Sequence, residues 1–175
     1  MKKTLLIAGF GGQGVMLIGK VLGYTATRIG LHATFFPAYG AEQRGGTANC
    51  SVIVSDNEIV CPLYQKFDNM IIMNESSFSR FGNYLSENGM MIVNSSLVFS
   101  RPSKNIDCHL IDTDGVTKKL GNRKVANMVA LGAYLKIAGT YDLDVVKIVL
   151  KDLLNPNPVL IELNIKAIEA GYGLL

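Results

Sequence analysis

The chain has 175 residues, of which 49% are hydrophobic and 18% charged, and its formal net charge at pH 7 is +3. No Lys/Arg run exceeds two residues, so the basic surface that nucleic-acid binding requires is excluded. No apolar run reaches the roughly 18–20 residues of a membrane-spanning helix. The low charged fraction predicts a surface partly buried against another chain, and an ordinary apolar surface is the alternative.

The first apolar run, "KKTLLIAGF", predicts a buried strand over residues 3–8. Two lysines before an apolar run also occur at the start of signal peptides. Glycines follow here where a cleavage site would stand, so we expect the first strand of a cytoplasmic protein. A helix is predicted next over 14–29. Small residues recur in it at helical spacing and predict a smooth face for close packing: Gly19, Gly23 and Ala26.

A second strand is predicted in "LHATFFP", and we expect Pro37 to end it. Two β-rich runs then flank the turn cluster at 55–57, which predicts an antiparallel hairpin. Further elements are predicted in chain order: strands at 67–74, 89–96 and 105–112, with a helix at 75–85, and then helices at 123–139, 143–154 and 159–172.

This alternation of strands and helices predicts an α/β fold within a single domain, residues 1–175. We expect a three-layer Rossmann-like sandwich whose mixed sheet is mostly parallel and contains the inserted antiparallel hairpin.

Glycines satisfy G-x-G-x-x-G at Gly9, Gly11 and Gly14, between the first strand and the first helix. Glycines let the backbone approach a phosphate, and the N–H groups at the helix N-terminus attract anions. Gly12 and Gln13 depart from the usual dinucleotide fingerprint, and residues 21–36 contain no carboxylate to hold a ribose. The pattern therefore disfavours NAD. It leaves open a turn that binds nothing, or a helix end that meets a phosphate or a partner's backbone.

The loop after the second strand, "YGAEQRGGTANC", combines glycines with one acid and one base. Arginine suits phosphate or carboxylate, and ligands of open α/β sheets bind at the carboxyl edge that this loop leaves. A solvated turn is the alternative. The candidate ligand-facing residues are Tyr39, Glu42, Arg44, Gly45, Gly46 and Thr47.

Reactive groups show no catalytic or metal-binding pattern. The cysteines Cys50, Cys61 and Cys108 are widely spaced without any CxxC, and both histidines stand alone, so we expect no metal site in this chain. Motifs of hydrolases, phosphate-loop enzymes and zinc proteases are absent, and no catalytic residue is assigned. Asn127, early in the helix at 123–139, is expected to point inward.

Taken together, several stretches resemble the gamma subunit of 2-oxoacid:ferredoxin oxidoreductases. They are "GFGGQGV", "YGAEQRGGTANCSV", "ANMVALGA" at 126–133, and the spacing of Asn164, Ala167 and Gly171. The resemblance implies a part in a cofactor-facing surface for these residues: Gly9, Gly11, Gly12, Gln13, Gly14, Tyr39, Glu42, Arg44, Gly45, Gly46, Thr47 and Asn127.

The resemblance also implies a CoA-acylating oxidative decarboxylase of 2-oxoacids, of the 2-oxoglutarate or branched-chain type. The gamma chain would complete the active site and be inactive alone. Thiamine diphosphate, iron–sulfur clusters and coenzyme A would work in the assembled enzyme, with alpha, beta and ferredoxin-like delta subunits and with ferredoxin as acceptor. The isolated chain would self-associate. Two alternatives stay open: a stand-alone Rossmann-type nucleotide-binding enzyme, and a nucleotide-sensing assembly module.

Overall fold

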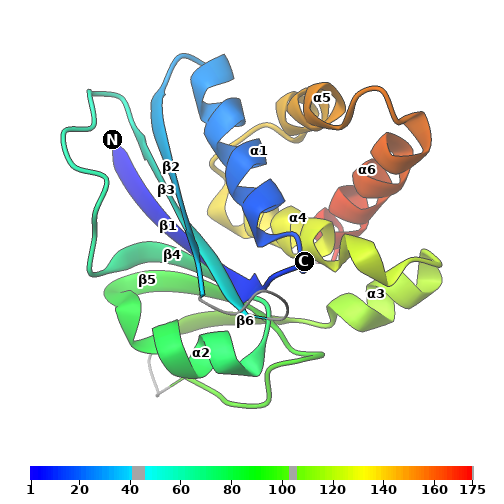
Figure 1. Ribbon diagram of the computed structural model, residues 1–175, viewed down its shortest axis with the longest axis horizontal. Helices are drawn as coiled ribbons and strands as arrows, with labels where there is room; N and C mark the ends of the chain where they lie inside the picture. The colour runs from blue at the N-terminus through cyan, green and yellow to red at the C-terminus, as the bar shows by residue number, and fades with distance from the viewer. Residues whose placement is uncertain (41–45, 103–105, 175) are drawn as a thin grey trace.

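The fold is built on a mixed six-stranded sheet with strand order β2-β3-β1-β4-β5-β6 (Figure 1). The structure is a computed structural model that describes residues 1–40, 46–102 and 106–174. Its strands are β1 (Lys2–Phe10), β2 (His32–Tyr39), β3 (Thr47–Ser55), β4 (Phe67–Ile72), β5 (Leu85–Asn94) and β6 (Asp107–Ile111). Strands β1, β4, β5 and β6 pair in parallel, whereas β3 runs antiparallel to both β1 and β2. The expected mixed, mostly parallel sheet is confirmed.

Helices cover both faces of the sheet, but unequally. The helices are α1 (Val15–Arg28), α2 (Glu75–Phe81), α3 (Thr113–Lys119), α4 (Ala126–Ala138), α5 (Leu143–Leu154) and α6 (Pro158–Tyr172), with 3₁₀ turns η1 (Gly82–Tyr84) and η2 (Arg123–Val125). Helices α1 and α4 lie on one face with α5 and α6 beyond them, while α2 lies on the other (Figure 1). The three-layer sandwich is therefore confirmed. Within the described ranges, no helix is both long and apolar enough to cross a membrane.

The central strand β1 explains why its sequence is apolar on consecutive positions. Leu5 and Ile7 face the core beneath α1 and α4, whereas Leu6 and Ala8 face the smaller core beneath α2. A strand covered on both faces needs an apolar side chain at each position, as a parallel strand in an α/β sheet does.

The hairpin differs from the expectation in one arm. Strand β3 forms, but residues 56–66 contain no strand, and Val60 in that segment is 94% exposed. The reason lies in the pairing of β3. Its register matches Ser55 with Lys2 of β1 on one side and with His32 of β2 on the other, so neither edge of β3 is left for a returning arm.

Two smaller expectations also need correction. Pro37 does not end the second strand, because β2 continues to Tyr39 with Pro37 opposite Cys50. Strand β2 is the outermost strand, where a proline without an N–H is tolerated. In α1, Gly19 and Ala26 are buried as expected, but Gly23 is partly exposed and does not belong to the packing face.

Candidate functional site

The glycine loop joins β1 to α1 at the carboxyl edge of the sheet. The amide of Gly11 donates to the carbonyl of Gly46 at 2.9 Å, which ties this loop to the start of β3. Gly12 and Gly14 have φ of 100° and 72°, a region that only glycine adopts without strain. Gly14 caps α1, and the first turn of that helix carries no acidic residue. The loop therefore presents an uncrowded, electropositive helix end.

Gln13 holds the loop from within. Its Oε1 accepts from the amide of Phe10 at 2.7 Å and from Nδ2 of Asn74 at 2.8 Å, and its Nε2 donates to the carbonyl of Met73 at 3.3 Å. Both ends of the side chain are thus occupied by the protein. The structure places Gln13 as a brace between the loop and the end of β4, and this brace explains the polar residue inside the glycine motif.

Asn127 braces the loop from the opposite side. Its Nδ2 donates to the carbonyl of Gly14 at 3.2 Å, and its side chain is buried at the start of α4, which confirms the inward orientation. A Cβ added to Gly14 would lie 2.2 Å from that nitrogen. The contact joins residues 113 positions apart in the chain, so α4 directly sets the position of the glycine loop.

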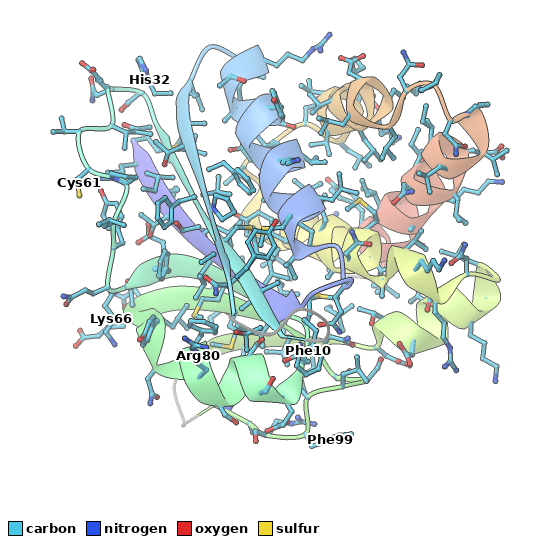
Figure 2. All side chains as sticks on the ribbon, viewed as in Figure 1. Phe10, His32, Cys61, Lys66, Arg80 and Phe99 are labelled. Carbon is cyan, nitrogen blue, oxygen red and sulfur yellow. The ribbon has the colours of Figure 1, made fainter. Side chains whose placement is uncertain are left out.

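A groove of about 420 Å³ opens between the glycine loop, α1 and the ends of β2 and β3. It is lined by Phe10, Gly11, Gly12, Gly14, Val15, Met16, Leu17, Lys20, Tyr39 and Ala48. Among its described lining residues, Lys20 is the only charged one. Figure 2 shows Phe10 at this end of the sheet, opposite the end that carries His32. The electropositive helix end and one lysine suit an anionic group with an apolar neighbour.

The candidate site residues divide by position. Gly11, Gly12, Gly14 and Tyr39 line the groove, and Tyr39 is 71% exposed. Gly9 is buried, and a Cβ there would lie 2.7 Å from Oε1 of Gln13, so its role is close packing. Thr47 accepts a hydrogen bond from Arg80 of α2 at 3.3 Å and lies outside the groove lining. Glu42, Arg44 and Gly45 lie outside the described residues.

A row of buried side chains at the carboxyl ends of β4 and β5 is missing from the sequence-based set. Asn74 accepts from the amide of Ser77 at 2.9 Å and caps α2. Asn94 donates to the carbonyl of Met73 at 3.2 Å and accepts from the hydroxyl of Thr113 at 2.8 Å. Both asparagines directly follow apolar runs in the sequence, a signal that was available. They order the sheet edge beside the glycine loop.

Cys50 is buried against the first turn of α1, and its thiol stays protonated. Its Sγ donates to the carbonyl of Val15 at 3.5 Å, and burial raises the pKa of the thiol to about 12. Cys61 is exposed and Cys108 is partly buried. Within the part of the chain that the structure describes, no three His, Cys, Asp or Glu side chains are grouped as a metal site requires.

Comparison with known proteins gives a consistent result over the whole chain. The family model for pyruvate ferredoxin/flavodoxin oxidoreductase matches residues 4–174. The 2-oxoglutarate synthase subunit KorC of Methanothermobacter marburgensis is 34% identical, with 100% of this chain and 97% of that protein covered. The ketoisovalerate oxidoreductase subunit VorA of the same organism is 30% identical over 94% of this chain, which spans only 35% of VorA's length.

A solved structure shares the fold from end to end. The gamma subunit of a keto/oxoacid ferredoxin oxidoreductase from Geobacter sulfurreducens PCA superposes with a TM-score of 0.83 and 27% identity. The match covers 97% of this chain and 96% of that one.

Proposed function

The chain belongs to the pyruvate ferredoxin/flavodoxin oxidoreductase family, and on that premise we propose that it is the gamma subunit of a 2-oxoacid:ferredoxin oxidoreductase. The observation that carries the proposal is the similarity to KorC, which is 34% identical, with 100% of this chain and 97% of that protein covered. The chain would be one gamma-type domain in a cytoplasmic complex with alpha, beta and ferredoxin-like delta subunits, and ferredoxin would accept the electrons.

We propose a 2-oxoglutarate or branched-chain 2-oxoacid as substrate. The similarity to a 2-oxoglutarate synthase subunit and to a ketoisovalerate oxidoreductase subunit supports these two classes. Ferredoxin reduction by the co-expressed complex, measured with a panel of 2-oxoacids, tests the choice. Highest kcat/KM with 2-oxoglutarate or 2-oxoisovalerate is expected, and highest kcat/KM with pyruvate would contradict it.

The part that this chain plays is to bind and orient an anionic group rather than to react with it. Thiamine diphosphate and iron–sulfur clusters, held by the other subunits, would supply carbanion stabilisation and electron transfer. The first residues of α1, together with Lys20 and Tyr39, line one groove. These groups fit a phosphate and an apolar segment of coenzyme A, and Arg44, in the sequence between β2 and β3, is proposed to add a second positive charge.

Substituting Lys20→Gln in the assembled enzyme tests this role. Because the ammonium would attract coenzyme A in the ground state and the transition state alike, we expect a higher KM for coenzyme A at unchanged kcat. The matched control is Lys118→Gln on α3, away from the groove lining. Arg44→Ala should change the KM in the same direction as Lys20→Gln. Unchanged kinetics for both variants would remove this groove from coenzyme A binding.

The chain purified alone provides a second test. As a gamma subunit it should reduce no acceptor until its companion subunits are added. Turnover by the lone chain, or tight binding of a nicotinamide dinucleotide to it, would favour a stand-alone nucleotide-binding enzyme instead.

A further inference from the structure

The outer strand β2 has an edge that no described strand covers. It pairs with β3 in one unbroken antiparallel register, from His32 opposite Ser55 to Tyr39 opposite Ala48, and it ends the strand order of the sheet. The sequence of β2, "HATFFPAY", contains no Lys, Arg, Asp or Glu. Charges are a common device that keeps an edge strand from pairing with another chain, and here Pro37 is the one residue that blunts the edge.

The opposite edge of the same sheet is protected differently. Strand β6 has only five residues, and its His109 Nε2 lies 2.8 Å from an Asp107 carboxylate oxygen. A short strand that carries a carboxylate follows the usual pattern of a protected edge. Strand β2 is longer and regular and contains no Lys, Arg, Asp or Glu, so of the two edges it is the one suited to strand addition.

A groove of about 220 Å³ runs beside the β2 edge, between this strand and α1. It is lined by Lys20, Gly23, Tyr24 and Thr27 of α1 and by Ala33, Thr34 and Phe35 of β2. A Cβ added to Gly23 would meet no atom within 4 Å, so there is open space above that residue. The ring of the adjacent Tyr24 is 58% exposed. An unfilled space and an exposed aromatic ring thus stand side by side on one surface.

We propose that this surface binds a second copy of the chain across a two-fold axis, with β2 pairing antiparallel to its symmetry mate. Such an interface requires a self-complementary patch, since each copy contributes the same surface. The Tyr24 ring of one copy enters the space above Gly23 of the other. The sheets join into one, and the two α1 helices lie side by side on the same face.

Two further features favour a second copy as the occupant. The groove lining places Gly23 and Tyr24 of α1 beside Thr34 near the middle of β2, so one axis serves both the strand pair and the helix pair. In an antiparallel pair of α1 helices centred there, Lys20 faces Thr27 of the other copy instead of Lys20. The two Lys20 side chains are therefore kept apart, and Arg28, next to Thr27, pairs with Asp152 of its own chain at 2.7 Å.

The full chain, purified without companion subunits, tests the proposal by analytical ultracentrifugation over a wide concentration range. We expect the wild type to dimerise. Gly23→Lys should raise the dimer dissociation constant about 100-fold, because a long charged side chain fills the receiving space. Lysine is a better helix former than glycine, so the melting temperature of the monomer should not fall. Gly23→Ala is the matched control and should keep the dimer, as should Phe99→Ala on a distant surface.

Hydrogen exchange identifies which surface is used. In the wild-type dimer the amides of residues 32–36 should exchange more slowly than in Gly23→Lys. A wild-type chain that stays monomeric, a Gly23→Lys dimer as tight as wild type, or a dimer with unprotected β2 amides would each overturn the proposal. Loss of assembly with companion subunits in Gly23→Lys, without loss of self-association, would assign the groove to a partner subunit and overturn it too. The sedimentation and hydrogen-exchange readouts use the chain alone and do not depend on the proposed 2-oxoacid activity, so the two proposals fail separately.

Discussion

Glycine serves opposite purposes in two regions of the molecule, the glycine loop and the crossing of α4 with α6. In the crossing, a Cβ on Gly132 would lie 2.1 Å from the carbonyl oxygen of Ile168, and one on Gly171 would lie 2.0 Å from that of Val129. In the loop, a Cβ on Gly11 would find its nearest atom at 3.8 Å, and one on Gly12 would find none within 4 Å. Glycine brings two helix backbones into contact in the first region and leaves backbone open to a ligand in the second.

Because glycine can serve either purpose, a glycine motif in the sequence does not by itself indicate a binding site. The stretches 126–133 and 164–171 are part of the resemblance to the gamma-subunit family, as the glycine loop is, yet their glycines form the α4–α6 seam. Asn164 also has a structural role, since it is buried and its Nδ2 donates to the carbonyl of Leu160 within α6 at 2.7 Å. A motif shared with a family therefore marks packing as readily as binding, and only the surroundings of each glycine separate the two.

The largest expected effect comes from Gly171→Ala or Gly132→Ala at the seam. The added methyl group overlaps a helix carbonyl, so the helices must separate, and we expect a loss of about 3 kcal/mol in the free energy of unfolding. Urea denaturation measures it. Gly23→Ala is the control, because its methyl group meets open space and should add about 0.5–1 kcal/mol of stability. Equal stability of all three variants would contradict the claim that glycine is required by close packing at the seam.

A smaller loss is expected where the loop meets the core. Gly14→Ala forces a positive φ on alanine and overlaps Asn127, which should cost about 1–3 kcal/mol. Asn127→Ala removes a hydrogen bond from the Gly14 carbonyl and should cost about 1–2 kcal/mol. Because Asn127→Ala also removes the overlap, the double variant should lose at least about 0.5 kcal/mol less than the sum. Additive losses in the free energy of unfolding would show that the alanine side chain at position 14 does not overlap Asn127.

The buried Cys50 thiol makes the free energy of unfolding depend on pH in the alkaline range. Its pKa is about 12 in the folded protein against 9.0 for the free thiol, so the folded state keeps a proton that the unfolded state loses. The stabilisation is complete below pH 9 and is lost as pH rises toward 12, at about 1.4 kcal/mol per pH unit. Cys50→Ala should remove this component of the alkaline slope. An alkaline slope in Cys50→Ala equal to that of the wild type would contradict this assignment.

The smallest effect on stability is expected for Gly11→Ala. Its methyl group fits without overlap, so the free energy of unfolding should change by less than about 0.5 kcal/mol. In the assembled enzyme the same methyl group would narrow the groove and raise the KM for coenzyme A. A large loss of stability would show that the loop is packed as tightly as the seam, and unchanged kinetics would show that no ligand approaches Gly11.

The elements themselves were largely predictable, because each follows from local pattern. The predicted strand at 3–8 and the predicted helices at 14–29, 143–154 and 159–172 lie close to the observed bounds of β1, α1, α5 and α6. Helix α3 was missed because its seven residues carry little apolar periodicity. It begins where Asp112 accepts from the amide of Gly115 at 2.9 Å.

The candidate site was predictable in place but not in the roles of its residues. The glycine loop lies at the carboxyl edge of the sheet, as its position between β1 and α1 required. Gln13 and Asn127, however, are braces inside the protein, and Lys20 of α1 joins the groove without any motif to mark it. Side-chain roles of this kind depend on contacts with β4 and α4, which are distant in sequence.

By itself the sequence determined most of the elements, the mixed α/β class and the position of the glycine loop, since hydrophobic period and turn residues act over a few neighbouring positions. Only the tertiary structure decided that β3 lies between β1 and β2, that Asn127 holds Gly14, and which glycines face open space. Each of these depends on which distant backbone lies alongside. That choice is set by the burial of whole faces against one another, and a local pattern does not contain it.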